Sequence, residues 1–451
     1  MRDSSFPTIV HLGAEHCVTG SCHMLQAKGI NILVDCGLAQ GSDKVHPIRD
    51  WPLRASQVDY LFLTHAHIDH VGRLPELIKN GFRGEIIMTH PTKMLLPHML
   101  QDAMHFSDLK DEEIGPLSRA IEDLSWGFEY NETFDLKQGI RFKLGRAGHI
   151  LGSSFIRFES LDPPWSVLFS GDLGSKDTPI LPDPDIPDAC DLLILESTYG
   201  DTLHGDREHR MERLGAVLTK CLSDGGKVFV PAFALGRTQE LIYEMDRLTS
   251  DSTWRKRFPK LTPHSRIPVC LDSPLGLEIT KVYSNLKPYW DSEAKEILRT
   301  GDDPLDFGQL YAAVRFDDHA RLMAMKGPAV IIAGSGMCSG GRIVDHLKDG
   351  LEDPRNDVLF IGYQAEGSPG RDILRNAGKP GGYVKLEGMR VSIRARIQTL
   401  TGYSAHADSR GLLEWVQSMP GKPKRIKLVH GGALARQGLA KKLREVGYQV
   451  E

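Results

Sequence analysis

The segment Thr64-His65-Ala66-His67-Ile68-Asp69-His70 follows directly on the apolar run Tyr60–Leu63, which has the composition of a buried strand. Side chains of an extended segment alternate between its two faces, so His65 and His67 point to the same side. Two imidazoles in that position can hold one metal ion. A polar surface loop would use the same residue types, but this density of histidine and aspartate favours a metal site.

The end of the same segment supplies Asp69 and His70, at the start of a helix predicted over 70–79. Both side chains can reach a second ion close to the first. One loop cannot complete the coordination of two ions, so further ligands must come from other segments. A single histidine beside a glycine is more often solvated than bound to a metal, which leaves each candidate open when it is taken alone. The candidates at predicted strand ends are His149 in Gly-His-Ile-Leu-Gly-Ser, Asp172 in Ser-Gly-Asp-Leu-Gly and His406 in Ser-Ala-His-Ala-Asp.

The pattern of apolar runs and turn residues divides the chain into three parts. Up to about residue 205, short buried strands end in polar residues, where loops carry the chemistry. From 206 to 375 the pattern changes to strand, glycine-containing turn and helix, which predicts a small parallel sheet. Residues 376–451 return to extended segments, with a final strand over 426–429 and a terminal helix. We therefore expect 1–205 and 376–451 to form one domain, with 206–375 inserted into it.

Composition excludes several classes of protein. The chain has 451 residues with 41% hydrophobic and 25% charged residues, which is ordinary globular usage. Lys and Arg number 55 against 59 Asp and Glu, so a uniformly basic coat for nucleic acid is absent. The 7 scattered cysteines indicate a reducing compartment rather than a disulfide framework. No apolar run is long enough to span a bilayer and the N-terminus lacks the apolar run of a leader, so we expect a cytoplasmic protein with no membrane partner.

Several motifs in a fixed order resemble one family. The succession of Asp35, the motif over 64–70, His149 and Asp172 is similar to that of the metallo-β-lactamase superfamily. Glu196 in Glu-Ser-Thr-Tyr-Gly, His406 and the inserted domain resemble the β-CASP branch, whose members include RNA-processing nucleases. The resemblance covers nearly the whole chain and includes the segments 231–240 and 334–338. It implies an α/β fold, an αββα metallo-β-lactamase sandwich with an inserted α/β domain that contains the parallel sheet.

The resemblance also implies a cofactor of two Zn²⁺ ions per chain. His65, His67 and His149 would hold one ion, and Asp69, His70 and His406 the other. Asp172 would bridge the two ions, and Asp35 would orient the loop that carries the ligands. Glu196 would lie beside the leaving group. The implied catalytic residues are therefore Asp35, Asp69, Asp172, Glu196 and His406.

The activity implied is hydrolysis of RNA by hydroxide that two metal ions activate. RNA-processing members carry a histidine where His406 stands, whereas DNA-repair members carry an aliphatic residue. We expect single-stranded RNA as the partner, internal cleavage because the chain ends soon after its last predicted helix, and a homodimer as an option. The family's eukaryotic nucleases carry a histidine where this chain has Arg371-Asp372, so Arg371 could contact phosphate or form an ion pair. The residues predicted to bind substrate are Arg237, Ser335, Gly336, Arg342 and Arg371.

Other functions remain compatible with parts of this pattern. A DNA nuclease of the same branch would use the same chemistry. A hydrolase of small thioesters or lactams would share the metal ligands, but it has no need of the inserted domain. A catalytically silent binding subunit is disfavoured because every expected metal position is filled.

Overall fold

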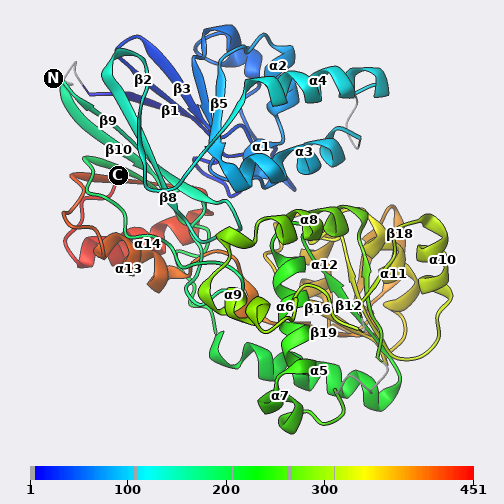
Figure 1. Ribbon diagram of the computed structural model, residues 1–451. Coiled ribbons are helices and arrows are strands. Elements are labelled where there is room, and N and C mark those ends of the chain that lie inside the picture. The colour runs from blue at the N-terminus through cyan, green and yellow to red at the C-terminus, as the bar shows by residue number, and fades with distance from the viewer. Residues whose placement is uncertain (1–5, 106–108, 206, 262–266, 309) are drawn as a thin grey trace. The chain divides into compact units, whose positions relative to one another are not determined.

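The computed structural model describes residues 6–105, 109–205, 207–261, 267–308 and 310–451 (Figure 1). It divides into a first unit, residues 1–203 and 406–451, and a second unit, residues 204–405. The insertion therefore continues to residue 405 instead of ending at 375 as predicted. The predicted boundary residue Asp206 and the N-terminal residues 1–5 lie outside the described residues.

Two six-stranded sheets form the centre of the first unit. The first sheet has the order β1-β2-β3-β4-β5-β6, in which β1 to β3 are antiparallel and β3 to β6 are parallel. Its strands are Thr8–Gly13, Cys22–Ala27, Ile30–Val34, Tyr60–Phe62, Glu85–Thr89 and Ser125–Phe128.

The second sheet of this unit has the order β20-β11-β10-β9-β8-β7. Strands β7 to β10 run antiparallel, while β10, β11 and β20 are parallel. Strand β20 comes from the end of the chain and lies beside β11, so the C-terminal segment completes this sheet. In the order β7, β8, β9, β10, β11, β20, the strands are Thr133–Asp135, Ile140–Arg146, Ser154–Leu161, Pro164–Phe169, Leu192–Glu196 and Arg425–Val429.

The two sheets pack face to face and helices cover their outer faces, which gives the αββα order (Figure 1). Between the sheets, Phe62 of β4 meets Phe158 of β9 edge to face with ring centroids 4.8 Å apart. Helices α1 to α4 pack against the first sheet, and α13 and α14 pack against the second. They span Ile68–Val71, Leu74–Lys79, His90–His105, Asp111–Leu124, Ser409–Gln417 and Ala433–Glu445, and short 3₁₀ turns lie at Ile48–Asp50, Ala55–Gln57 and Lys137–Gly139.

The helix predicted over 70–79 begins earlier and is divided in two. Helix α1 starts at Ile68, and α2 starts at Leu74 with Pro75 in its first turn. Proline lacks the amide proton that a continuous helix needs, so it favours a new helix start. Between them, the Arg73 amide donates to the carbonyl of Cys36 at 2.9 Å, which ties the break to the end of β3.

The second unit has one parallel sheet of order β14-β13-β15-β12-β16-β19, with helices packed against it. In chain order its strands β12 to β16 and β19 are Lys227–Pro231, Val269–Asp272, Leu310–Ala312, Ala329–Ala333, Asp357–Phe360 and Arg396–Thr399. Helices α5 to α12 are Arg210–Asp224, Arg237–Ser250, Ser252–Arg257, Pro274–Asn285, Ser292–Arg299, Phe316–Ala324, Arg342–Gly350 and Pro369–Asn376, with 3₁₀ turns at Arg207–His209, Lys287–Tyr289 and Thr401–Tyr403.

Residues 376–405 belong to the second unit because they complete its sheet and core. Strand β19 pairs with β16, and the Arg396 guanidinium forms ion pairs with Asp357 and Asp224. A hairpin of β17, Tyr383–Leu386, and β18, Met389–Ser392, adds Val384 and Val391 to the core of this unit.

No helix in the described part of the chain combines the length and apolar character that a bilayer crossing requires.

Phe158→Ala tests the contact between the sheets. Phe158 is fully buried, so we expect the free energy of unfolding to fall by about 3–5 kcal/mol. Leu161→Ala on the same strand is the control, because Leu161 is 68% exposed and its loss should cost no more than about 0.5 kcal/mol. Chemical denaturation measures both, and equal effects would contradict this packing.

Candidate metal centre

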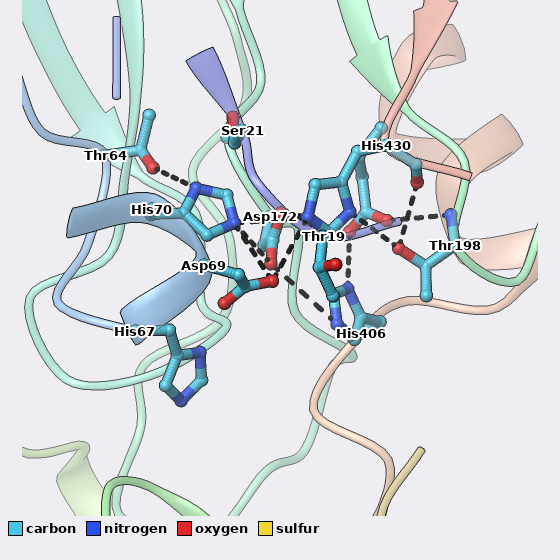
Figure 2. Close-up of polar contacts among 12 residues, drawn as sticks. Thr19, Ser21, Thr64, His67, Asp69, His70, Asp172, Thr198, His406 and His430 are labelled. Carbon is cyan, nitrogen blue, oxygen red and sulfur yellow. Dashed lines mark hydrogen bonds and ion pairs between the residues drawn. The ribbon is translucent and has the colours of Figure 1, made fainter. Parts of the chain in front are cut away.

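Strand ends of the first unit bring the candidate ligands together. His65 and His67 follow β4, Asp69 and His70 lie on α1, and Asp172 follows β10. Figure 2 shows Asp69, His70, Asp172, His406 and His430 pointing toward one another. The remaining side chains of the centre are His149 in the turn between β8 and β9, Glu196 at the end of β11, His406 before α13 and His430 directly after β20.

The first group of ligands consists of His65, His67 and His149. His67 Nδ1 lies 3.1 Å from His65 Nε2 and 3.1 Å from His149 Nε2. Asp172 Oδ2 is 3.7 Å from His65 Nε2 and 3.6 Å from His149 Nε2. Ligands about 2.0–2.1 Å from a tetrahedral zinc ion lie about 3.3 Å from one another, so these spacings suit one shared ion.

The second group consists of Asp69, His70 and His430. His430 Nε2 lies 3.2 Å from His70 Nε2 and 3.7 Å from Asp69 Oδ2. Asp172 faces this group as well, because its Oδ2 is 3.3 Å from His70 Nε2 and its Oδ1 is 3.5 Å from His430 Nε2. The carboxylate of Asp172 therefore lies between the two groups.

His430 is the residue that sequence reasoning missed. It follows the final strand, β20, and the same signal of a polar residue at a strand end had selected Asp172. The sequence prediction placed His406 with Asp69 and His70, whereas the structure groups His430 with them. His406 lies instead with His149 and Asp172, and its Nε2 is 3.8 Å from Asp172 Oδ2.

The other ring nitrogen of His406 faces Glu196. His406 Nδ1 donates to Glu196 Oε1 at 3.1 Å. The amides of Leu173 and Thr198 donate to the two oxygens of Glu196 at 2.7 and 3.1 Å, so this carboxylate is held in place. The result is a carboxylate–imidazole pair at the edge of the ligand groups.

Asp35, which was predicted to orient the loop that carries the ligands, is almost fully buried and contacts that loop. Its Oδ2 accepts from His70 Nδ1 at 2.7 Å and from Ser21 Oγ at 3.1 Å. Its Oδ1 accepts from the Thr64 amide at 2.8 Å. These bonds place the proton of His70 on Nδ1 and leave Nε2 to face the second group.

Electrostatics at the centre favour a cation. Burial, with help from His70, lowers the pKa of His65 well below its usual value, so this ring is neutral and offers a lone pair. Burial opposes the charge of Asp172, but His430, His70 and His406 outweigh it and hold the pKa of Asp172 well below its usual range. Burial also lowers the pKa of His70, yet Asp172 and Asp35 raise it well above normal, which shows the negative potential at this ring.

The residues present fit divalent metal ions. Imidazole nitrogens and carboxylate oxygens are the donors that zinc takes in hydrolytic sites. Asp172 Oδ1 is buried and receives no hydrogen bond within the described residues, an arrangement that is costly unless a cation balances the charge. Its spacing from the surrounding ring nitrogens leaves room for ions between the groups.

A second cluster of metal-competent side chains, in the second unit, lacks that room. Asp272 Oδ2 lies 2.6 Å from His319 Nδ1 and 2.6 Å from His346 Nε2, which are direct hydrogen bonds. Arg342 Nη1 donates to Asp272 Oδ1 at 2.7 Å and already supplies a positive charge. This cluster is a satisfied buried network.

The residues predicted to bind substrate all lie in the second unit. Arg237 is only 4% exposed, and its guanidinium bonds to Glu240 and to the carbonyl of Tyr403. Arg342 is committed to Asp272, as described above. These partners argue against the predicted contact of Arg237 and Arg342 with substrate, because either residue would have to abandon a buried ion pair.

The other three predicted contacts have different surroundings. The Arg371 side chain is 48% exposed and pairs with Glu366 at 2.8 Å. Ser335 Oγ accepts from the Ser339 amide at 3.0 Å in the loop before α11. Gly336 packs so closely on the Phe233 ring that a Cβ there would come within 2.7 Å of it.

Comparison with family models matches three segments of the chain. Residues 17–232 match the metallo-beta-lactamase superfamily and residues 238–373 match the Beta-Casp domain. Residues 390–451 match a Zn-dependent metallo-hydrolase RNA specificity domain. The family and the fold class predicted from sequence are thereby confirmed.

Known proteins resemble the chain over most of its length. Ribonuclease TTHA0252 of Thermus thermophilus is 37% identical over 98% of this chain and 97% of its own. Cleavage and polyadenylation specificity factor 73 of Drosophila melanogaster is 30% identical over 95% of this chain and 60% of its own. A protein of unknown function from Enterococcus faecalis V583 has a crystal structure that matches with a TM-score of 0.55 at 12% identity, over 98% of this chain and 97% of that one, which supports the fold alone.

These matches agree with a metal centre whose ligands are contributed by strand ends on both sheets of the first unit. The chain belongs to the β-CASP branch of the metallo-β-lactamase superfamily and is a metal-dependent hydrolase.

Proposed function

We propose that the chain is a zinc-dependent ribonuclease that hydrolyses phosphodiester bonds within single-stranded RNA. The observation that carries this proposal is the pair of ligand groups that meet at Asp172, which suits two ions acting on one phosphate. RNA as the substrate is supported by the RNA specificity domain matched over 390–451 and by the ribonuclease of T. thermophilus.

Each ligand group would hold one Zn²⁺ ion, and Asp172 would serve both. When bound, the ions would supply a hydrolytic nucleophile from water at neutral pH and neutralise charge on the phosphate. Asp35 holds His70 with Nε2 facing its group, and Thr64 Oγ1 lies 3.1 Å from His65 Nδ1 on the outer side of that ring. The proposed ligands are His65, His67 and His149 for one ion, and Asp69, His70 and His430 for the other.

His406 would act on the leaving group rather than on a metal ion. Its Nδ1 proton is held by Glu196, so a further proton on the imidazole resides at Nε2, on the side of Asp172. Transfer of the Nε2 proton to the departing 3′ oxygen would leave a 3′-hydroxyl on one product and a 5′-phosphate on the other. The negative charge of Glu196 stabilises the protonated ring before the transfer.

Contacts to the RNA backbone are proposed for residues of the second unit that retain accessible donors. Arg371 is half exposed and sits in the first turn of α12. Ser335 and Gly336 lie in the loop that leads to α11, but the Ser335 amide already donates to the carbonyl of Gly340 at 3.1 Å and Gly336 is buried, so Arg371 is the contact that we propose.

Cleavage of matched 5′-labelled single-stranded RNA and DNA by the purified protein tests the proposal. We expect internal cuts in RNA and none in DNA, and complete loss of cleavage after treatment with a chelator. The double variant Asp69→Ala/His70→Ala should lose cleavage to the same extent, because it removes the second ligand group.

The products decide between the alternatives. Single-nucleotide products would replace the endonuclease with an exonuclease. A protein that contains zinc but cuts neither polymer would contradict the ribonuclease proposal.

His430→Ala and His406→Ala distinguish a ligand from a proton donor. We expect His430→Ala to lose one zinc ion per chain, since it removes one of the three donors of its group. His406→Ala should keep both ions and lose about 10²–10⁴-fold in the rate of the chemical step. Elemental analysis and single-turnover kinetics give the two readouts, and loss of zinc from His406→Ala would restore the ligand role predicted from sequence.

Arg371→Ala should weaken RNA binding without affecting the metal. Loss of one phosphate contact lowers the slope of log affinity against log salt by about one. Arg375→Ala is the matched control, because Arg375 lies one turn further along α12, is 60% exposed and pairs with Asp372 in the same way. Binding curves at several salt concentrations measure both variants, and an unchanged slope for Arg371→Ala would remove Arg371 from the interface.

A further inference from the structure

Thr198 lies beside His430 at the edge of the metal centre (Figure 2). It is 6% exposed and belongs to the turn that follows β11. Its amide donates to Glu196 Oε2 at 3.1 Å, and its hydroxyl meets the side chain of His430 at 3.1 Å and the carbonyl of His430 at 3.2 Å.

The direction of these hydrogen bonds fixes the tautomer of His430. A threonine hydroxyl has one proton, which Thr198 donates to the carbonyl of His430. With the proton used in this way, the hydroxyl oxygen accepts at its second contact and His430 Nδ1 is the donor there. Nε2 is left without one, and its lone pair faces Asp69 and Asp172 at 3.7 and 3.5 Å.

The rings of His65 and His70 are held in the same way. Thr64 Oγ1 donates to Asp35, at 3.0–3.1 Å from its two oxygens, and accepts from His65 Nδ1 at 3.1 Å. Asp35 accepts from His70 Nδ1. Each outer partner therefore turns the unprotonated nitrogen of its ring toward the metal position.

We propose that Thr198 is the positioning residue that keeps His430 in its metal-binding tautomer and orientation. This inference rests on the proposed function, in which His430 is a zinc ligand. Partners of this kind typically change metal affinity 10- to 100-fold, and the affinity of the ion held by Asp69, His70 and His430 is the quantity that Thr198 sets.

Thr198→Val tests this role with little change of shape. Valine fills the space of the hydroxyl and keeps the amide that holds Glu196, so the change removes only the two contacts of the hydroxyl with His430. We expect the weaker-bound Zn²⁺ of the variant to be held about 10- to 100-fold less tightly, measured on metal-free protein by competition with a chromophoric chelator. Thr198→Ser keeps the hydroxyl and should bind Zn²⁺ as the wild type does.

Ser197→Ala is the matched control for a merely structural effect. Ser197 is fully buried in the same turn, but its hydroxyl donates to the carbonyl of Val429 and touches no ligand side chain. We expect both zinc affinities to be unchanged in this variant. An equal loss in Ser197→Ala and Thr198→Val, or unchanged affinity in Thr198→Val, would overturn the proposal.

A measurement on the wild type does not depend on the folding of any variant. In zinc-loaded protein labelled with ¹⁵N-histidine, His430 should show a slowly exchanging proton on Nδ1, assigned by its absence in His430→Ala. An unprotonated Nδ1 would overturn the proposal. These readouts concern metal binding and protonation, so they are independent of RNA cleavage. Normal zinc binding without RNA cleavage would contradict the ribonuclease proposal alone. If His430→Ala retains both ions, His430 is not a ligand and this inference fails as well.

Discussion

The buried carboxylate of Asp172 is the charge around which the first unit is arranged. It is only 2% exposed, and an ionised group in that position is tolerated only when positive charge or hydrogen-bond donors surround it. Its Oδ2 faces ring nitrogens of both ligand groups and its Oδ1 faces His430, so balancing the charge of Asp172 brings both groups to the same place. The ligands then lie close enough to share it because they stand at the ends of neighbouring strands.

This arrangement depends on pairing between distant parts of the chain. Strand β20 pairs with β11 in a register that sets Val429 opposite Glu196, and this places His430 beside the turn that contains Thr198. The C-terminal segment is therefore part of the metal centre as well as of the second sheet. The insertion of the second unit between these strands leaves that pairing intact.

The sequence was most informative where chemistry and strand ends coincide. The motif over 64–70 and Asp172 were recognised because metal-competent residues follow apolar runs, and the structure brings them together. His430 follows such a run too, but a single histidine gains its neighbours only when β20 pairs with β11. The compact second unit extends beyond 375 to 405 because β19 pairs with β16, and the pattern of this partly exposed edge strand does not reveal its partner. Arg237 was misjudged because the start of α6 is buried almost throughout, and the letters Gly-Arg do not indicate which way the side chain points.

The hydrogen-bond partners of the imidazoles couple metal binding to the fold of the first unit. Asp35 at the end of β3 holds His70, whereas Thr198 beyond β11 holds His430, so the same ligand group is oriented from both sheets. A shift of either strand end would turn a ring away from its ion, and a bound ion in turn opposes that shift. The amide of Thr198 also holds Glu196, so the turn after β11 couples the position of a metal ligand to that of the carboxylate that serves His406. In the proposed mechanism, one short turn would thus set ligand geometry and leaving-group chemistry together.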